Sequence, residues 1–579
     1  MSFPFYSRRS TVYSSRGMVA STQALANAAG VRILEKGGNC VDAAIAVSAA
    51  LCVSEPTSTG IGGDCFALYY KKGPAGGQVL GLNATGRAAL AVTIQDVWDH
   101  HNHGQPMARI PYESVFSVTV PGAIAGWHDA WRQWGSGTVA FHELLQPAVD
   151  MAQRGFPVAE VLAHLWQRGV AKLQRQSPVP NPFIVDGRAP YEGDVVTNTP
   201  VAEALKLIGQ HGKDAFYKGP IGDALVAETS SRGHKLSHHD LASHTSTFVE
   251  PLSVDFWGYQ VWEIPPNGHG IVALMALGMI QTLHDQGTID LTKMEHNLAE
   301  YLHVVVEVCK LAFYDSDEYV TDPQFHDIPV EHLVSRAYLR QRAKQFAPGA
   351  VVEPPSTMRH AVPNPRHRSD TVYLTVGDAN GEACSFINSV YRGFGSGIVV
   401  PEYGFCLHNR GANFNLTAGA PNSLEGGKRP YHTIIPGMIT KNGELYASFG
   451  NMGGFAQPIC HVQHVVNMTV FGMTPQQLVD ALRVVLSAWE DEDAGAADSG
   501  RGADGPVSTP RTEVHLEAGI APAVVQQLSS WGHYTREVTG SARSTFGRAQ
   551  IIQMSTHRHG FTYAGGSDPR GDGAAVALV

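Results

Sequence analysis

The amino-acid sequence predicts a mixed α+β protein, large enough for one big domain or two. The chain has 579 residues, and its hydrophobic fraction of 43% suits a globular core. A stretch that begins near residue 371 alternates as a strand does and turns back on itself. An Ala-rich stretch near the N-terminus, and most of the span 141–283, follow the period of a helix.

The N-terminal region is expected to contain strands at both ends of a helical pair. Residues 17–21 have the pattern of a short strand that leads into a helix at residues 24–35. Residues 42–53 are very apolar and rich in Ala, which predicts a second helix. Residues 66–70 and 78–83 then follow as a pair of strands.

Two stretches invite a binding-site interpretation, and the residues favour a plainer one. The glycine-rich turn at residues 60–65 lacks the third glycine of a dinucleotide fingerprint and follows a helix rather than a strand, so we favour a closely packed turn. His100, His101 and His103 lie beside Asp99, but a metal needs opposed ligands and partners behind them. A polar loop is favoured there, and neither a metal nor a cofactor is expected.

The middle and the end of the chain mix helices with irregular segments. One strand-like piece at residues 259–264 interrupts the helical span; a helix opens at Ile271 and another covers residues 295–314. Residues 351–368 are rich in Pro, His and Arg, which predicts an exposed linker. Residues 490–510 are acidic and rich in Gly and Ala, which predicts a flexible surface insertion.

The hairpin at residues 371–389 is the most informative stretch. Every second residue from Thr371 falls on one face of the first strand, and residues 378–381, Asp-Ala-Asn-Gly, supply a turn. Folding about this turn brings Ser389 opposite Thr371, or within one residue of it. By itself the pattern is also typical of a purely structural hairpin.

Composition argues against several classes of partner and against export. Charged residues make up 16% of the chain and the formal net charge is −10, which favours neither nucleic acid nor an anionic membrane surface. No apolar run approaches the ~20 residues of a membrane span. Residues 1–15 are polar with no apolar core of a secretory signal, and the seven cysteines are scattered without a CxxC pair. We therefore expect reduced cysteines and a cytoplasmic location.

The stretch that begins at Thr371 resembles the start of the small subunit in the γ-glutamyltransferase family of N-terminal-nucleophile hydrolases. The spacing from Thr371 to residues 394–398, Phe-Gly-Ser-Gly-Ile, fits that family without a gap. Residues 38–44, 55–63 and 119–127 resemble its other motifs. The resemblance covers nearly the whole chain and implies an α+β fold, a four-layer αββα sandwich of the N-terminal-nucleophile type.

The resemblance also implies that the chain cuts itself between Asp370 and Thr371. Residues 1–370 would become a large subunit and residues 371–579 a small one, held together as a heterodimer. Thr371 would be the nucleophile, and its freed α-amine, with a pKa of about 7.7–8.0, would be the base. The substrate would be a small-molecule amide, attacked at its carbonyl to give a threonyl acyl-enzyme that water or an amine acceptor resolves.

Other positions match the family's catalytic and binding residues. Ser389 takes the place of a Thr that hydrogen-bonds the nucleophile, and Gly453 and Gly454 match the pair whose N–H groups form the oxyanion hole. Arg87 lies about two places from a family Arg that binds the α-carboxylate of the substrate. Thr85 stands where that Arg would be.

The positions that would grip a γ-glutamyl group depart from the family. Tyr391, Arg410 and Asn413 stand in place of Asn, Gln and Asp, and His432 and Thr433 replace two Ser residues. The pocket has thus lost the acid that holds the substrate amine and gained a guanidinium suited to a carboxylate.

This pattern resembles the acylase-like and amidohydrolase branches of the family. The first hypothesis is therefore a self-processing amide hydrolase or acyltransferase that acts on a carboxylate-bearing acyl group. A true γ-glutamyltransferase or glutathione hydrolase is one alternative. The other is an uncleaved, inactive relative that serves as a structural or binding protein.

Overall fold

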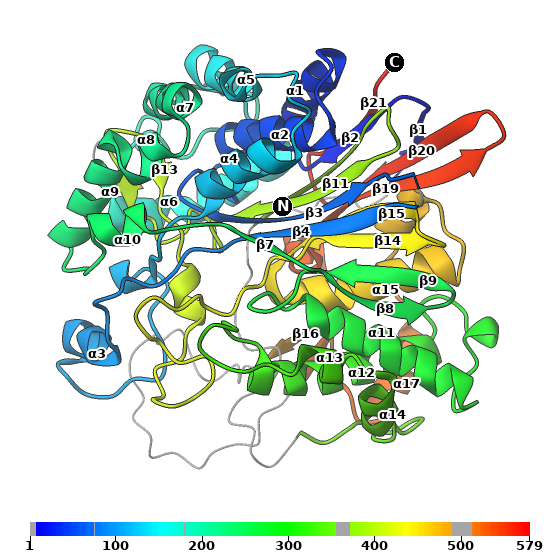
Figure 1. Ribbon diagram of the computed structural model, residues 1–579. Coiled ribbons are helices and arrows are strands. Elements are labelled where there is room, and N and C mark those ends of the chain that lie inside the picture. Colours follow the sequence, from blue (N-terminus) through cyan, green and yellow to red (C-terminus); the bar gives the residue numbers. More distant parts are fainter. Residues whose placement is uncertain (1–6, 8, 75, 179–180, 355–370, 489–511) are drawn as a thin grey trace.

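Two seven-stranded sheets packed face to face form the centre of the protein, and helices cover the outer face of each (Figure 1). The computed structural model describes residues 7, 9–74, 76–178, 181–354, 371–488 and 512–579. Helices, sheet, sheet and helices follow one another in space. The predicted α+β class and the four-layer αββα sandwich are therefore confirmed.

Sheet one contains the strand that follows Thr371. Its order is β21-β2-β10-β11-β3-β4-β7, and each neighbouring pair is antiparallel. The strands are β2 (Met18–Ser21), β3 (Asp64–Lys71), β4 (Gln78–Ala84), β7 (Thr247–Val249), β10 (Val372–Gly377), β11 (Ala383–Ser389) and β21 (Ala574–Ala577). β10 thus lies inside the sheet, between β2 and β11.

Sheet two has the order β1-β20-β19-β15-β14-β9-β8 and is also antiparallel throughout. Its strands are β1 (Val12–Ser14), β8 (Leu252–Phe256), β9 (Tyr259–Glu263), β14 (Gly437–Lys441), β15 (Glu444–Met452), β19 (Arg548–His557) and β20 (Gly560–Ser567). Three small sheets complete the strands: β5 (Phe156–Pro157) with β6 (Val195–Val196), β12 (Val399–Val400) with β13 (Phe405–Cys406), and β16 (Val484–Ala488), β17 (Thr512–Glu517) and β18 (Tyr534–Val538).

The inner faces of the two sheets meet where β10 crosses β15. Thr375 Oγ1 donates to Ser448 Oγ at 2.7 Å. The ring of Tyr373 lies so close to Gly450 that a β-carbon there would come within 2.3 Å of it. Tyr373 belongs to the core between the sheets, whereas Val372 packs on the helical side, so the alternation predicted for the first strand is confirmed.

The outer face of sheet one is covered by α1, α2 and α4 (Figure 1). α2 is buried along its whole length, and its first turn is capped by Asn39, whose side chain accepts from the N–H groups of Val41 and Asp42. The helices of the N-terminal part are α1 (Ala24–Glu35), α2 (Cys40–Ser54), α3 (Ile94–Asn102), α4 (Ala123–Trp134), α5 (Phe141–Arg154), α6 (Glu160–Gln176), α7 (Thr199–His211), α8 (Asp214–Tyr217), α9 (Pro220–Ser231) and α10 (His238–Ala242).

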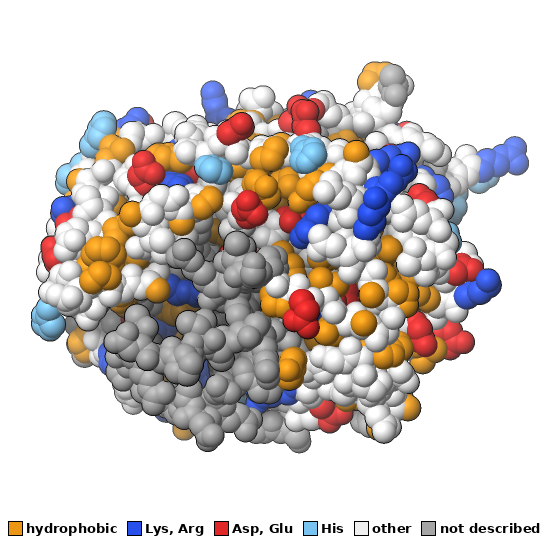
Figure 2. Space-filling model, turned by 90° about the horizontal axis from the view of Figure 1, so that it is seen from below, with side chains coloured by type: hydrophobic (Ala, Val, Ile, Leu, Met, Phe, Trp, Pro, Cys, Tyr) orange, Lys and Arg blue, Asp and Glu red, His pale blue; other side chains and the backbone are white. Residues whose placement is uncertain are grey.

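The outer face of sheet two is covered by α11, α15 and α16, and α12 packs on α11 and α15. These and the remaining helices are α11 (Gly270–Asp285), α12 (Ala299–Tyr319), α13 (Val330–Leu333), α14 (Arg336–Ala343), α15 (Gln457–Thr469), α16 (Pro475–Asp480) and α17 (Pro522–Ser530). No helix in the described part of the chain is long and apolar enough to cross a bilayer. On the face seen in Figure 2, acidic and basic side chains are interspersed.

Several sequence predictions need correction. His100 and His101 lie on α3 rather than in a loop, because Thr93 and Asp96 form a capping box that starts a helix there. The span 141–283 contains the two-residue strands β5 and β6 and the edge strands β7 and β8 besides the expected strand β9. All four are short, and their few residues show no clear period. The predicted insertion at 490–510, and the predicted linker from residue 355 on, lie outside the described residues.

Candidate active site

The predicted pairing of two hydroxyl groups at the start of the hairpin is confirmed by the structure. Thr371 immediately precedes β10, and the register that pairs Val372 with Asn388 places Thr371 opposite Ser389. Both side chains are buried, and their oxygens, Oγ1 and Oγ, lie 3.0 Å apart. Asp370, on the other side of the predicted cut, lies outside the described residues.

Ser389 is oriented by two further donors. The backbone N–H of Tyr391 donates to Ser389 Oγ at 2.7 Å, and Arg410 Nη2 donates to the same oxygen at 3.4 Å. A hydroxyl has two lone pairs and one proton. Ser389 therefore receives two hydrogen bonds besides its contact with Thr371, in which either hydroxyl can be the donor.

Arg410 brings a positive charge into this buried cluster. It begins a short 3₁₀ helix, η3 (Arg410–Asn413), and its side chain is fully buried. Nη1 donates to Thr433 Oγ1 at 2.7 Å, and the guanidinium carbon lies 4.1 Å from the centre of the Tyr391 ring. Burial lowers the pKa of Arg410 to about 10, so the group stays protonated at neutral pH.

Among the residues that the structure describes, no carboxylate forms a direct ion pair with Arg410, and the charge of Asp64 acts on it only from beyond that distance. Its hydrogen bonds go to two hydroxyl groups, and its face rests on an aromatic ring. A buried cation is costly unless it is paired. The cluster is therefore chemically suited to receive an anion, such as a carboxylate of a bound molecule.

His432 contacts a buried carboxylate that the sequence reasoning missed. Its Nε2 lies 3.2 Å from Asp64 Oδ2, and His408 Nδ1 lies 3.4 Å from the same oxygen. Burial raises the pKa of Asp64, but His408 and the hydrogen bond from His432 outweigh it and hold that pKa well below its usual value. Burial, together with the nearby Arg410, lowers the pKa of His432 to about 3, so its imidazole is neutral.

Asp64 also organises the backbone near the site. Its Oδ1 accepts from the N–H groups of Gly86 and Gly122, each at 3.0 Å. A carboxylate inside a run of glycines and apolar residues, at the start of β3, was the signal in the sequence that could have identified it. Through His432, it fixes the loop that carries Thr433 and hence one partner of Arg410.

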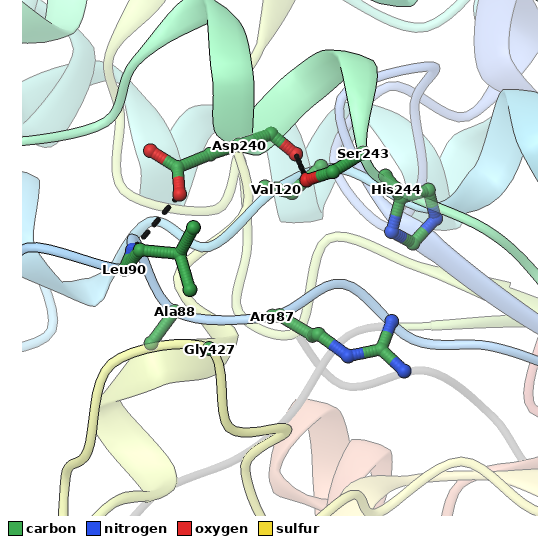
Figure 3. A pocket seen from close by; sticks show the side chains of 8 residues that line it. All are labelled: Arg87, Ala88, Leu90, Val120, Asp240, Ser243, His244 and Gly427. Carbon is green, nitrogen blue, oxygen red and sulfur yellow. Dashed lines mark hydrogen bonds between the residues drawn. The ribbon is translucent and has the colours of Figure 1, made fainter.

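Asn413 and Arg87 do not contact the Thr371 cluster through their hydrogen bonds. Asn413 Nδ2 donates to the carbonyl of Tyr431 at 2.9 Å. Arg87 Nη2 donates to Gln324 Oε1 at 3.2 Å, and its side chain lines a cavity of about 40 Å³ (Figure 3). The other residues that line this cavity are Ala88, Leu90, Val120, Asp240, Ser243, His244 and Gly427. A binding role for Arg87 and Asn413 therefore remains a prediction.

Gly453 and Gly454 come directly after β15, the strand that crosses β10. At this crossing Thr375 contacts Ser448, and Tyr373 contacts Gly450. Because the contacts advance by two residues on each strand, Thr371 is expected to lie near the end of β15, where the two glycines are. Gly453 has φ of 142° and Gly454 has φ of 58°, conformations that favour glycine. A short 3₁₀ turn, η4 (Gly454–Ala456), then leads into α15, so backbone N–H groups gather at a helix start, where negative charge is favoured.

Replacing Gly454 by Val tests the predicted oxyanion hole. The branched side chain should displace the backbone donors and lower kcat by ~10²-fold or more, which is the scale of losing one donor. Val is also strained at the positive φ of this position. Gly472→Val is a matched control, because Gly472 has φ of 65° and no atom within 4 Å of an added β-carbon. Steady-state kinetics of both variants should separate the two effects; an unchanged kcat in Gly454→Val would place the oxyanion site elsewhere.

Comparison with known proteins adds an independent line of evidence. The sequence model of the gamma-glutamyltranspeptidase family matches residues 26–578. The chain is 35% identical to a glutathione hydrolase-like YwrD proenzyme of Bacillus subtilis, over 98% of this chain and 99% of that protein. It is 28% identical to an oxamate amidohydrolase proenzyme of Klebsiella pneumoniae, over 97% and 98% of the two chains. The structure of a cephalosporin acylase from Bacillus halodurans is similar with a TM-score of 0.84 and 36% identity, and covers 100% of this chain and 98% of that one.

Proposed function

The chain belongs to the gamma-glutamyltranspeptidase family, and from that premise we propose that it is an amide hydrolase that cuts itself between Asp370 and Thr371. Residues 1–370 and 371–579 would then remain together as a heterodimer. The word proenzyme in the names of its relatives supports self-processing. Thr371 is buried and immediately precedes β10, and this position supports its role as the N-terminal residue of the small subunit after the cut.

The proposed reaction uses the new N-terminus as both nucleophile and base. The α-amine of Thr371 accepts the hydroxyl proton, directly or through a water, while the hydroxyl of Ser389 lies 3.0 Å from the same oxygen. Thr371 Oγ1 attacks the substrate carbonyl, and the N–H groups of Gly453 and Gly454 stabilise the oxyanion. The leaving amine takes up the proton and departs, which leaves an ester to Thr371. Water, activated by the same amine, hydrolyses this ester and releases the acid.

The preferred acyl group is proposed to carry a carboxylate and no ammonium. The observation that carries this proposal is the buried guanidinium of Arg410, hydrogen-bonded to Ser389 and so within two hydrogen bonds of the nucleophile. A substrate carboxylate beside it would gain a charge-assisted contact. A substrate ammonium would face a like charge, and Asn413 offers it no compensating negative charge. One relative is named as an amidohydrolase of oxamate, itself a carboxylate-bearing amide.

Two alternatives stay in view. A true γ-glutamyltransferase or glutathione hydrolase is favoured by the names of several relatives, and it would have to bind the substrate amine without the acid at position 413. An uncleaved structural or binding relative would run as one chain of 62.2 kDa on a denaturing gel. Two fragments on that gel would exclude it.

The deciding experiment compares two anilides that differ in the α-amine. kcat/KM for glutaryl anilide is expected to exceed that for γ-glutamyl anilide by at least about tenfold, since an unpaired buried charge costs ~3–5 kcal/mol. The processed protein is assayed with both compounds under one set of conditions. If the γ-glutamyl compound is preferred by tenfold or more, the glutathione-hydrolase hypothesis replaces this one.

A further inference from the structure

A second buried polar cluster joins α12 to the chain just before β18. His303 and Glu307 lie one helical turn apart on α12, so both side chains project from the same face. His533 immediately precedes β18 and meets them there. The exposed fractions are 2% for His303, 0% for Glu307 and 6% for His533. The catalytic proposal uses none of these residues.

The nitrogen and oxygen atoms of the three side chains converge. His303 Nδ1 lies 2.7 Å from His533 Nε2, and His533 Nδ1 lies 3.7 Å from Glu307 Oε1. One ligand atom from each residue can be chosen so that all three lie within 4.8 Å of one another. Two His and one Glu form one of the sets of three protein ligands that hold Zn²⁺.

A hydrogen bond to a backbone carbonyl selects the tautomer of His303 that metal binding requires. Its Nε2 lies 2.9 Å from the carbonyl oxygen of Ala347, which can only accept a hydrogen bond. Nε2 therefore carries the proton, and Nδ1 offers a lone pair toward His533. A metal-binding His commonly donates its second N–H to a carbonyl in this way. Without a metal, His533 Nε2 then donates to His303 Nδ1, and metal binding requires this proton to move to Nδ1 of His533, which faces Glu307 Oε1.

We propose that His303, Glu307 and His533 form a binding site for a divalent transition-metal ion, with Zn²⁺ as the best match. With Zn–N bonds of about 2.0–2.1 Å in tetrahedral geometry, the two ring nitrogens need to move apart by only ~0.6 Å from their present 2.7 Å. The three protein ligands leave a fourth position for a water or a backbone oxygen.

Lys310 is the competitor of the ion at this site. Its Nζ donates to Glu307 Oε1 at 2.9 Å and to the carbonyl of Val352 at 3.0 Å, and its side chain is 9% exposed. An ammonium and a metal ion cannot share one carboxylate oxygen at low cost, because their charges repel. Metal binding must therefore shift Lys310 toward Val352. Because of this competition, removing the charge of Lys310 should change the affinity for zinc, which distinguishes a metal site from a simple hydrogen-bonded pair of histidines.

The site would link the two products of self-cleavage. His303 and Glu307 lie before residue 370, and His533 lies after it. This part of the inference rests on the proposed function, whereas the metal site itself does not. Glu307 also holds the chain ahead of the proposed cut, since the N–H of Val352 donates to Glu307 Oε2 at 2.5 Å. A bound ion would act as a clamp between the fragments.

The test measures zinc binding by the full-length protein after removal of metals with a chelator. Zinc chloride is titrated against a chromophoric competing chelator, and bound zinc is counted by mass spectrometry after gel filtration. One zinc per chain is expected. Loss of an outer-shell partner typically costs 10–100-fold in metal affinity, so His533→Gln, which removes a ligand, should weaken binding by about 10²-fold or more. Lys310→Met should instead strengthen it by about tenfold or more, because a like charge is removed.

Two controls make the result decisive. His557→Gln/His559→Gln removes an exposed pair of histidines from the β19–β20 hairpin and should leave zinc binding unchanged. The Thr371→Ala chain keeps all three ligands and should bind zinc as tightly as the wild type, whether or not the chains are cut. This control separates the metal site from the self-cleavage proposal. Equal zinc binding by the wild type and His533→Gln would overturn the proposal, as would binding lost only in the His557→Gln/His559→Gln variant. A Lys310→Met chain that folds but gains no affinity would also overturn it.

Discussion

Thr371→Ala is expected to leave a single uncut chain of 62.2 kDa with no amide hydrolase activity. The substitution removes the hydroxyl that lies 3.0 Å from Ser389 Oγ, and with it the nucleophile for both the proposed self-cleavage and turnover. The wild type should give two bands, and N-terminal sequencing of the smaller one should begin Thr-Val-Tyr-Leu. A denaturing gel, sequencing and an activity assay on the purified chains are the measurements.

Thr375→Ala is the matched control for that experiment. Thr375 lies on β10, four residues after Thr371, and its hydroxyl donates to Ser448 Oγ in the core between the sheets. This variant should still be cut, with a loss of stability of about 1 kcal/mol for the lost hydrogen bond. A Thr371→Ala chain that still processes and turns over substrate would show that the nucleophile has been assigned wrongly.

Arg410→Gln combined with Asn413→Asp is expected to reverse the preference between acyl groups. Loss of the guanidinium should lower kcat/KM for glutaryl anilide by ~150- to 4,000-fold, corresponding to ~3–5 kcal/mol for a charge left without its partner. The new carboxylate at position 413 should raise kcat/KM for γ-glutamyl anilide, because it offers the substrate ammonium a charged acceptor. The ratio of the two values is the measurement, since it cancels any general loss of activity.

Arg410→Lys separates charge from geometry in this pocket. It keeps one positive charge but loses the planar fork and the stacking on Tyr391. The glutaryl compound should remain preferred, with a smaller margin than in the wild type. If the double variant keeps the wild-type ratio, Arg410 does not contact the substrate, and its role is confined to holding Ser389 and Thr433.

The local part of the site could be predicted from the sequence because it depends on one hairpin. Strand alternation and a four-residue turn fix which residues of the two strands face each other, and Ser389 indeed lies opposite Thr371. α1 begins and ends at the predicted residues for a similar reason, since its period and its Gly-rich end are local signals. The sandwich itself was implied by family resemblance and not by these patterns.

The missed features depend on contacts between distant segments. The role of Asp64 depends on its contacts with His408 and His432, which lie more than 340 residues further along the chain, so no local pattern could predict it. β7 and β8 form because other strands are present to pair with them, at registers that no local pattern encodes. The resemblance placed Arg410 in the substrate pocket, but only the fold shows that its guanidinium is enclosed beside Ser389.

The strand order of sheet one has a consequence for the chain end that self-cleavage would create. Strands from the two sides of residue 371 alternate: β21 and β10, from after it, hold β2, from before it, between them. A newly made terminus usually frays because little holds it. Here the fourth residue of the new chain, Leu374, already has a neighbouring strand on each side. The reactive amine would thus be tethered almost as firmly as a side chain in the interior, and the two polypeptides could part only by dismantling the sheet that they build together.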